Sequence, residues 1–144
     1  MSELYEADVF EWSQHQAALL RRRAAGELVN EADLDWPNIA KEIESVGSEQ
    51  RHAVEGNLVQ ALIHDLKCDA WPLVSYVPQW RAEARTLRRN ARRRFTNSMR
   101  GRIDLAVLYA DALAGMPESI DGQPPLPVPE VCPVTLDELL GDGP

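Results

Sequence analysis

The chain has 144 residues, of which 44% are hydrophobic and 26% are charged, a composition typical of one globular domain. Its formal net charge of −8 argues against general affinity of the whole surface for nucleic acid. No stretch approaches the roughly 18 apolar residues that cross a bilayer, and the first residues lack a signal-peptide pattern, so we expect a cytoplasmic protein without a membrane anchor.

The first half of the chain predicts three helices, each marked by apolar residues at a spacing of three and four. The second helix has an apolar stripe of Ile39, Ile43 and Val46, and the third has a longer stripe of Val54, Leu58, Ala61, Leu62 and Leu66. Asp35 is placed to cap the second helix. Gly47 separates the second helix from the third, because glycine suits the left-handed residue that ends a helix. The three predicted helices cover residues 6–24, 36–46 and 49–70.

The second half predicts two longer helices, over residues 80–95 and 99–114, followed by a proline-rich tail. The run QPPLPVPEVCPV is typical of an extended strap across a surface. Thr135 and Glu138 have the spacing of a capping box, which predicts a short helix over 136–140. We therefore expect an all-α protein, a single compact domain over 1–144, built as a bundle of four to five helices with a Pro-rich extended C-terminal strap.

Arginine is concentrated in residues 81–102, which contain nine arginines and one acidic residue. Arginine at a spacing of three and four on one helix face suits phosphate contacts, and Trp80 and Phe95 offer rings for stacking. The alternative is that these arginines face solvent or pair with acidic residues elsewhere. The candidate polyanion-binding residues are Arg81, Arg85, Arg88, Arg89, Arg92 and Arg93, and the candidate acidic partners are Glu42, Glu44, Glu49 and Glu55.

His64 is the candidate catalytic residue, because it stands among apolar residues, where a half-buried histidine takes a carboxylate partner. Glu44 and Asp8 are the candidate partners. Glu42, Glu44 and His64 are the candidate metal ligands, although no further ligand is evident and the sequence identifies no cofactor. The alternative is a satisfied polar link between helices that performs no chemistry.

Five motifs, in chain order, resemble a known bacterial family: YEADVFEW, NIAKEIESVG, LVQALIHDLK, WRAEARTLRRN and PEVCPVTLDELL. The chain is similar to the uncharacterised family named domain of unknown function 29. The resemblance implies a compact helical bundle and no particular activity. Members usually have leucine after the histidine of the third motif, whereas this chain has Asp65. The residues that match the family motifs are Tyr5, Asp8, Trp12, Glu42, Glu44, Gly47, His64 and Lys67.

Three functions follow as hypotheses. The first is a non-enzymatic helical protein-interaction module, with a homo-oligomer or another protein as partner. The second is nucleic-acid or polyanion binding through the Arg-rich helix within residues 81–102. The third is a metal-dependent or acid–base enzyme centred on His64.

Overall fold

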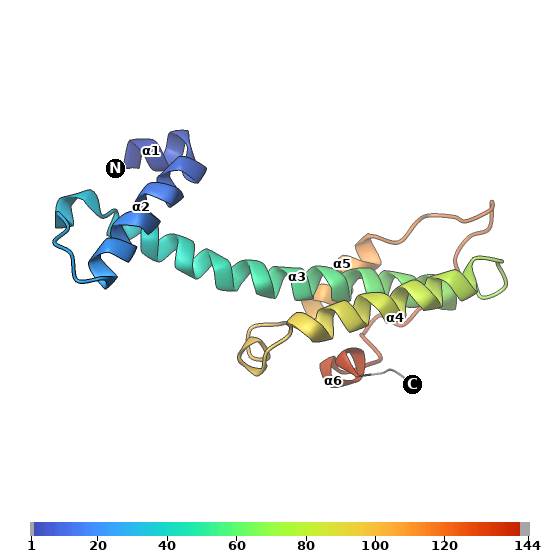
Figure 1. The fold of residues 1–144 in the computed structure, drawn as a ribbon. Coiled ribbons are helices and arrows are strands. Elements are labelled where there is room, and N and C mark those ends of the chain that lie inside the picture. Colours follow the sequence, from blue (N-terminus) through green and yellow to red (C-terminus); the bar gives the residue numbers. More distant parts are fainter. Residues whose placement is uncertain (1, 142–144) are drawn as a thin grey trace. The chain divides into compact units, whose positions relative to one another are not determined.

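The computed structural model describes residues 2–141, and its regular elements are helices, as predicted (Figure 1). The described residues form six α-helices, where a bundle of four to five helices and a further short helix over 136–140 were expected. The chain divides into two compact units, residues 1–48 and 49–144, so a single domain stays a prediction. The α-helices are α1 Ser2–Ala7, α2 Val9–Ala24, α3 Trp36–Ala70, α4 Val77–Arg94, α5 Leu105–Ala114 and α6 Leu136–Leu140, and the 3-10 helices are η1 Glu31–Asp33 and η2 Asn97–Met99.

The predicted helix over 6–24 is two helices in the structure, because Asp8 interrupts it. The φ angle of Asp8, −155°, takes this residue out of the helical region. Its Oδ1 accepts a hydrogen bond from the backbone nitrogen of Glu11 at 2.9 Å. Asp8 is therefore the N-cap of α2, a role that short polar side chains perform well.

The core of the first unit combines apolar packing with two buried polar side chains, Gln16 and Asp35. The amide of Gln16 donates to the carbonyl oxygen of Asp33 at 3.1 Å and accepts from the nitrogen of Asp35 at 2.9 Å. The carboxylate of Asp35 accepts from the indole of Trp12 at 3.0 Å. These bonds satisfy the buried groups and fix the connector before α3. The buried apolar residues are Trp12, Leu19, Leu34 and Ile39.

Helix α3 runs without interruption from Trp36 to Ala70, so the predicted break at Gly47 is wrong. The described glycines with positive φ are Gly26 and Gly122, and Gly47 is not among them. Without a left-handed residue the helix has no stop signal at this point. Glycine inside a helix costs about 1 kcal/mol relative to alanine, which the good helix formers on both sides offset. The predicted stripe is also only partly buried, since Ile39 is buried whereas Ile43 and Val46 are exposed.

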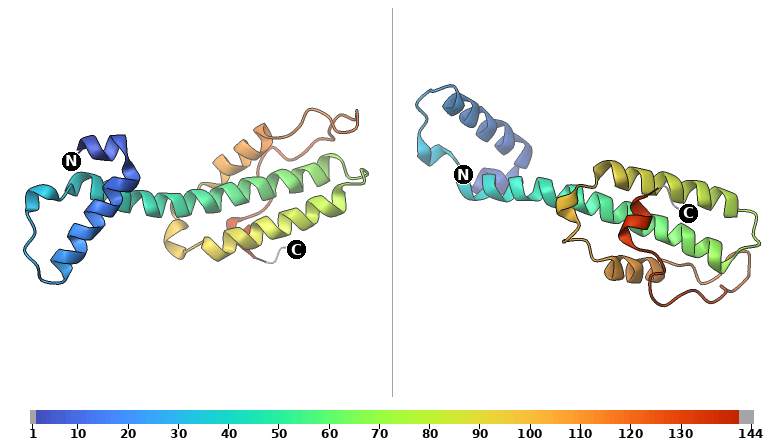
Figure 2. Two further views of the ribbon diagram at one scale, coloured as in Figure 1. Left: turned by 45° about the horizontal axis from the view of Figure 1, so that its top comes forward. Right: turned by 90° about the horizontal axis from the view of Figure 1, so that it is seen from below.

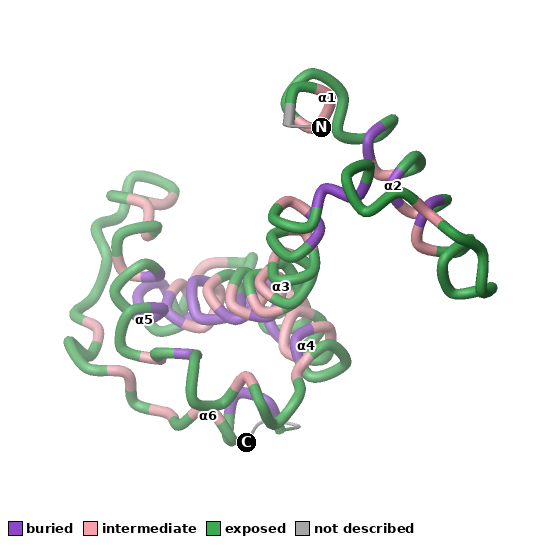
Figure 3. The backbone as a smooth tube through the Cα atoms, turned by 90° about the vertical axis from the view of Figure 1, so that its left-hand side faces the viewer, coloured by how far each residue is buried: buried purple, intermediate pink, exposed green. Residues whose placement is uncertain are grey.

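The second half of α3 forms the centre of the second unit. Its predicted apolar face is buried throughout, and Figure 3 shows buried positions gathered there and on the helices that face it. The main core of this unit also takes residues from α4, α5 and α6. Buried on this face are Val54, Leu58, Ala61, Leu62 and Leu66.

Two helix starts in the second unit differ from the prediction. Helix α4 begins at Val77, three residues early, because Pro78 fits the first turn, where its missing N–H has no partner to lose. The predicted helix over 99–114 is the 3-10 turn η2 followed by α5, whose N-cap is Asp104. Its Oδ1 accepts from the nitrogen of Ala106 at 3.1 Å. The short helix α6 has the predicted bounds, with Thr135 as its cap.

The segment from 123 to 135 contains no helix and contacts the second unit at several points. The indole of Trp71 donates to the carbonyl oxygen of Gln123 at 2.9 Å. The backbone nitrogen of Leu126 donates to the carbonyl oxygen of Ala70, also at 2.9 Å. Its last residues lead into α6, which packs against α4 (Figure 2).

Candidate functional site on helix α4

Three arginines of α4 form an exposed row, which we call the arginine row: Arg85, Arg89 and Arg93. They follow one another at intervals of four residues, a rise of about 6 Å each, so they lie on neighbouring turns of one flank. No ion pair joins any of the three to another described residue. Their guanidinium groups are thus available to a partner.

Arg88 differs from the row, because it points into the protein. Its Nη2 contacts Asp65 Oδ1 at 2.8 Å, and its side chain is only 15% exposed. Burial raises the pKa of Asp65, and the guanidinium of Arg88 opposes that rise. Asp65, at the position where the resemblance implies leucine, therefore serves as the internal partner of one arginine.

The remaining two candidates lie on the same flank of α4. Arg92 lines a small pocket of about 30 Å³ together with Arg85, Arg88, Arg89 and Gly141. Arg81 lies near the thiol of Cys68. Burial raises the pKa of this thiol, and the Arg81 charge acts against the shift.

The acidic partners named from the sequence do not neutralise the arginine row. Glu55 contacts Arg51 at 3.7 Å, and Glu42 accepts a hydrogen bond from Tyr5 at 2.5 Å. Glu44 and Glu49 are exposed.

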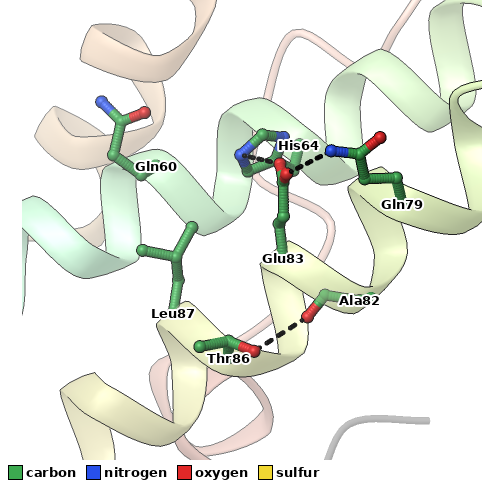
Figure 4. Close-up of a pocket in the computed structure, with 7 residues that line it drawn as sticks. All are labelled: Gln60, His64, Gln79, Ala82, Glu83, Thr86 and Leu87. Atoms are coloured by element: carbon green, nitrogen blue, oxygen red, sulfur yellow. Dashed lines mark hydrogen bonds and ion pairs between the residues drawn. The ribbon is translucent and has the colours of Figure 1, made fainter.

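His64 has a carboxylate partner, but a different one from the two that the sequence indicated. Its Nε2 lies 3.2 Å from Glu83 Oε2, and Glu83 Oε1 accepts from Gln79 at 3.0 Å (Figure 4). Glu44 and Asp8 belong to the first unit, where Glu44 is exposed and Asp8 caps α2. Only the pairing of α3 with α4 brings Glu83 to His64, so the helical periodicity of either segment alone could not reveal it.

The surroundings of His64 limit what it can do chemically. Burial lowers its pKa, the Glu83 charge opposes this, and Lys67 adds to the lowering. Its Nδ1 is buried and accepts no hydrogen bond in the described structure. A shallow groove of about 480 Å³ runs beside it, lined by Gln60, Thr86 and Leu87 among others. His64 and Glu83 thus form a dyad with no third titratable group on that groove.

The metal candidates Glu42, Glu44 and His64 do not gather into a site. Within residues 2–141, no three histidine, cysteine, aspartate or glutamate side chains are placed to hold one ion. Over the same residues, no helix is long and apolar enough to cross a membrane.

The sequence model of the family described as domain of unknown function DUF29 matches residues 4–143. The chain belongs to this family. The family membership expected from the sequence motifs is thereby confirmed over nearly the whole chain of this DUF29 protein. The family description assigns no activity. No curated protein is similar enough to the chain to count as a match.

A solved structure shares the fold of this DUF29 protein. It is the crystal structure of an alpha-helical protein of unknown function from Rhodospirillum rubrum ATCC 11170, with 24% sequence identity and a TM-score of 0.64. The match covers 94% of the DUF29 chain and 88% of the other chain. At this identity the similarity establishes the fold and leaves the function to the site itself.

Proposed function

We propose that this protein binds the phosphate backbone of a nucleic acid through the arginine row of α4. The observation that carries the proposal is that Arg85, Arg89 and Arg93 are exposed and form no ion pair with a described residue. The chain as a whole carries −8, so a basic helix flank on an acidic protein restricts polyanion contact to one place. Arg81 and Arg92 extend the same flank.

Recognition of this kind reads the backbone and not the bases. Trp80, which was expected to stack on bases, is buried at 9% exposure. Phe95 is half-buried, and the guanidinium of Arg100 lies 5.3 Å from its ring centre. With both rings occupied, the arginine row supplies phosphate contacts, which position a nucleic acid without reading its sequence.

The test is the salt dependence of binding to a fluorescently labelled DNA duplex, followed by fluorescence anisotropy. Replacing Arg85, Arg89 and Arg93 by glutamine removes three phosphate contacts, so the slope of log K against log salt falls by about 3. Binding of the wild-type protein should weaken steeply as salt rises.

A matched control replaces Arg21, Arg22 and Arg23 by glutamine. This triple variant changes the net charge by the same amount in the first unit, at the end of α2. It should keep the wild-type slope. Absence of duplex binding by the wild-type protein at low salt would refute the proposal, as would equal losses in the two triple variants.

A second candidate function, assembly of the chain with a copy of itself, is favoured by a separate observation. Ile43 and Val46, which belong to the apolar stripe of the predicted helix over 36–46, are 68% and 62% exposed on α3. Neighbouring large apolar side chains that stay in water, unlike single ones, are a feature of surfaces that bind a protein. We infer that this pair is a contact between copies, which fits the interaction-module hypothesis. A cytoplasmic location stays a prediction.

We further propose that residues 123–135 act as a strap that holds the second unit closed. The support is their attachment to the C-terminal end of α3 and to α5. Besides the two bonds to Ala70 and Trp71, the hydroxyl of Tyr109 on α5 donates to the carbonyl oxygen of Pro129 at 2.6 Å. Val128, Cys132 and Val134 also pack on buried residues.

A further inference from the structure

An open groove of about 760 Å³ lies between α3 and α4 in the second unit. The two helices run side by side, as Figure 1 shows, and Arg88 of α4 reaches Asp65 of α3. Arg93 belongs both to the arginine row and to the lining of this groove, so the two surfaces are continuous. We call it the α3–α4 groove, and its lining residues are Ala53, Gly56, Asn57, Gln60, Asn90, Arg93 and Arg94.

Three carboxamide side chains line the α3–α4 groove and have no partner within the described protein. Asn57 and Gln60 are neighbours on one face of α3, and Asn90 comes from α4. None of the three side chains forms a hydrogen bond with another group of residues 2–141. Each carboxamide carries two donors and an acceptor, so the groove offers both kinds of hydrogen-bonding group.

These amide groups are open to the groove although two of their residues are half-buried. Asn57 and Asn90 are half-buried, and Gln60 is exposed. In the described structure, the buried side-chain nitrogen and oxygen atoms that lack a partner are His64 Nδ1 and Arg88 Nε. The unbonded amide atoms of Asn57 and Asn90 are therefore not buried, and a ligand in the groove can reach them.

Small residues leave the α3 side of the groove open. Ala53 and Gly56 lie on adjacent turns of α3, and a Cβ added to Gly56 would meet no atom within 4 Å. Packing within the protein thus does not require a glycine here, although glycine destabilises a helix relative to alanine. The volume of the groove also falls in the range of about 300 to 1,000 Å³ that is usual for ligand sites.

The charged residues of the groove all carry the same sign. Arg93 and Arg94 are exposed, and no ion pair joins either of them to another described residue. The described lining contains no carboxylate that would repel a phosphate. The guanidinium plane of an arginine can also stack on a base. Amides and arginines together suit a group that is polar at its edge and flat on its face.

We propose that the α3–α4 groove receives an unpaired base of a single-stranded nucleic acid whose phosphates contact the arginine row. Base edges present donors and acceptors, as carboxamides do, so Asn57, Gln60 and Asn90 can bond to any of the bases. A duplex offers its phosphates to the row, but its bases are stacked and paired and do not reach between two helices. This contact rests on the proposed phosphate binding and gives it a preference for single strands, without reading their sequence.

The test compares two labelled single-stranded DNA oligonucleotides of equal length, one of mixed sequence and one built of abasic nucleotides. Both carry the same phosphate charge, so a difference in binding reports the bases. In fluorescence anisotropy, the wild-type protein should bind the strand with bases about tenfold or more tightly, because stacking and hydrogen bonds to the held base are absent from the abasic strand. Equal binding of the two strands overturns the base contact.

A substitution that fills the groove shows where the base binds. Gly56→Leu adds a side chain that meets no atom of the protein at its Cβ, and it should abolish the preference for the strand with bases. Gly47→Leu is the matched control, because Gly47 is also helical in α3, has open space around it and lies outside the lining. The control should keep the preference. A preference that survives in Gly56→Leu would place the base elsewhere and refute the proposal.

A second variant tests the amides without adding bulk. Asn57→Ala combined with Asn90→Ala should reduce the preference for the strand with bases several-fold, because it removes two of the three carboxamides. Gln50→Ala, which changes an exposed amide of α3 outside the lining, should leave it unchanged. Circular dichroism shows whether each variant is folded. If Gly56→Leu does not fold, the amide variant decides, and an unchanged preference in it refutes the proposal.

The base contact and the phosphate contacts can fail separately. Arg85→Gln combined with Arg89→Gln lies outside the lining, so it should lower the salt slope for both strands by about 1.4 and keep the ratio between them. Steep salt dependence with equal binding of both strands by the wild-type protein would leave the phosphate binding in place and refute the base contact. Absence of binding to either strand at low salt would refute both.

Discussion

At the scale of single residues, burial and one charged neighbour act in opposite directions on the pKa of His64. Its ring is 16% exposed, while its partner Glu83 is 43% exposed. The carboxylate favours the protonated ring, but desolvation is the larger effect and lowers the pKa of His64. Burial of the ring therefore disfavours a charged histidine, even with Glu83 beside it.

This balance predicts a pH-dependent stability. Because the pKa of His64 in the folded protein lies below the ordinary value of about 6.5, the unfolded chain takes up this proton first as pH falls. The free energy of unfolding should therefore decrease from pH 6.5 down to the folded pKa. His64→Gln should lose this part of the pH dependence, as measured by urea unfolding at several pH values.

The control is His52→Gln, which alters an exposed histidine on the same helix. It should keep the decrease seen in the wild type. A His64→Gln variant with an unchanged pH profile would mean that burial does not penalise the charged ring.

At the scale of elements, the most informative feature is the passage of α3 through Gly47. Space is open around this residue, since a Cβ added there would meet no atom within 4 Å. Its backbone is helical, which suits alanine better than glycine. A Gly47→Ala substitution should therefore have opposite effects on stability, depending on whether Gly47 ends a helix or lies inside one.

We expect Gly47→Ala to stabilise the protein by about 0.4 to 1 kcal/mol, because alanine loses less backbone entropy on folding. Gly26→Ala should do the opposite, because the φ of Gly26 is +87° and strains any other residue. Denaturant midpoints at constant slope measure both effects. A loss of stability in Gly47→Ala would instead indicate a left-handed residue and a helix break.

The same elements show what sequence reasoning can reach and where it stops. The buried face of α3 from Val54 to Leu66 was predictable, because periodicity within one helix decides it. The exposed arginine row was open to two interpretations, because its pairing depends on which helix lies opposite. Glu83 beside His64 and Asp65 beside Arg88 were both missed. Each pair joins α3 to α4, and their relative register is a tertiary property.

At the scale of the whole molecule, each compact unit has buried clusters of its own. The buried cluster of the first unit contains Trp12 and Leu19, and the main buried cluster of the second unit contains Val54 and Leu58. The exposed Ile43 and Val46 fall in the first unit, outside its buried cluster. An apolar pair left out of its own core needs another surface to leave water.

Assembly should therefore respond to charge at this pair. With Ile43 and Val46 both replaced by lysine, the protein should sediment as a monomer at concentrations where the wild type forms dimers. Leu73→Lys is the matched control, because Leu73 is 97% exposed in the second unit and should not matter. A wild-type protein that stays monomeric at all concentrations would remove the support for self-assembly.

The distribution of tryptophan gives the chain a built-in set of optical reporters. Trp12 and Trp36 lie in the first unit, and Trp71 and Trp80 lie in the second. Trp12 and Trp71 are each 3% exposed, so their emission shifts to longer wavelength when their surroundings open to water. Replacing Trp71 and Trp80 by phenylalanine confines the signal to residues 1–48, and the reciprocal pair of changes confines it to residues 49–144. Intrinsic fluorescence can thus follow the melting of each unit separately, without any attached dye.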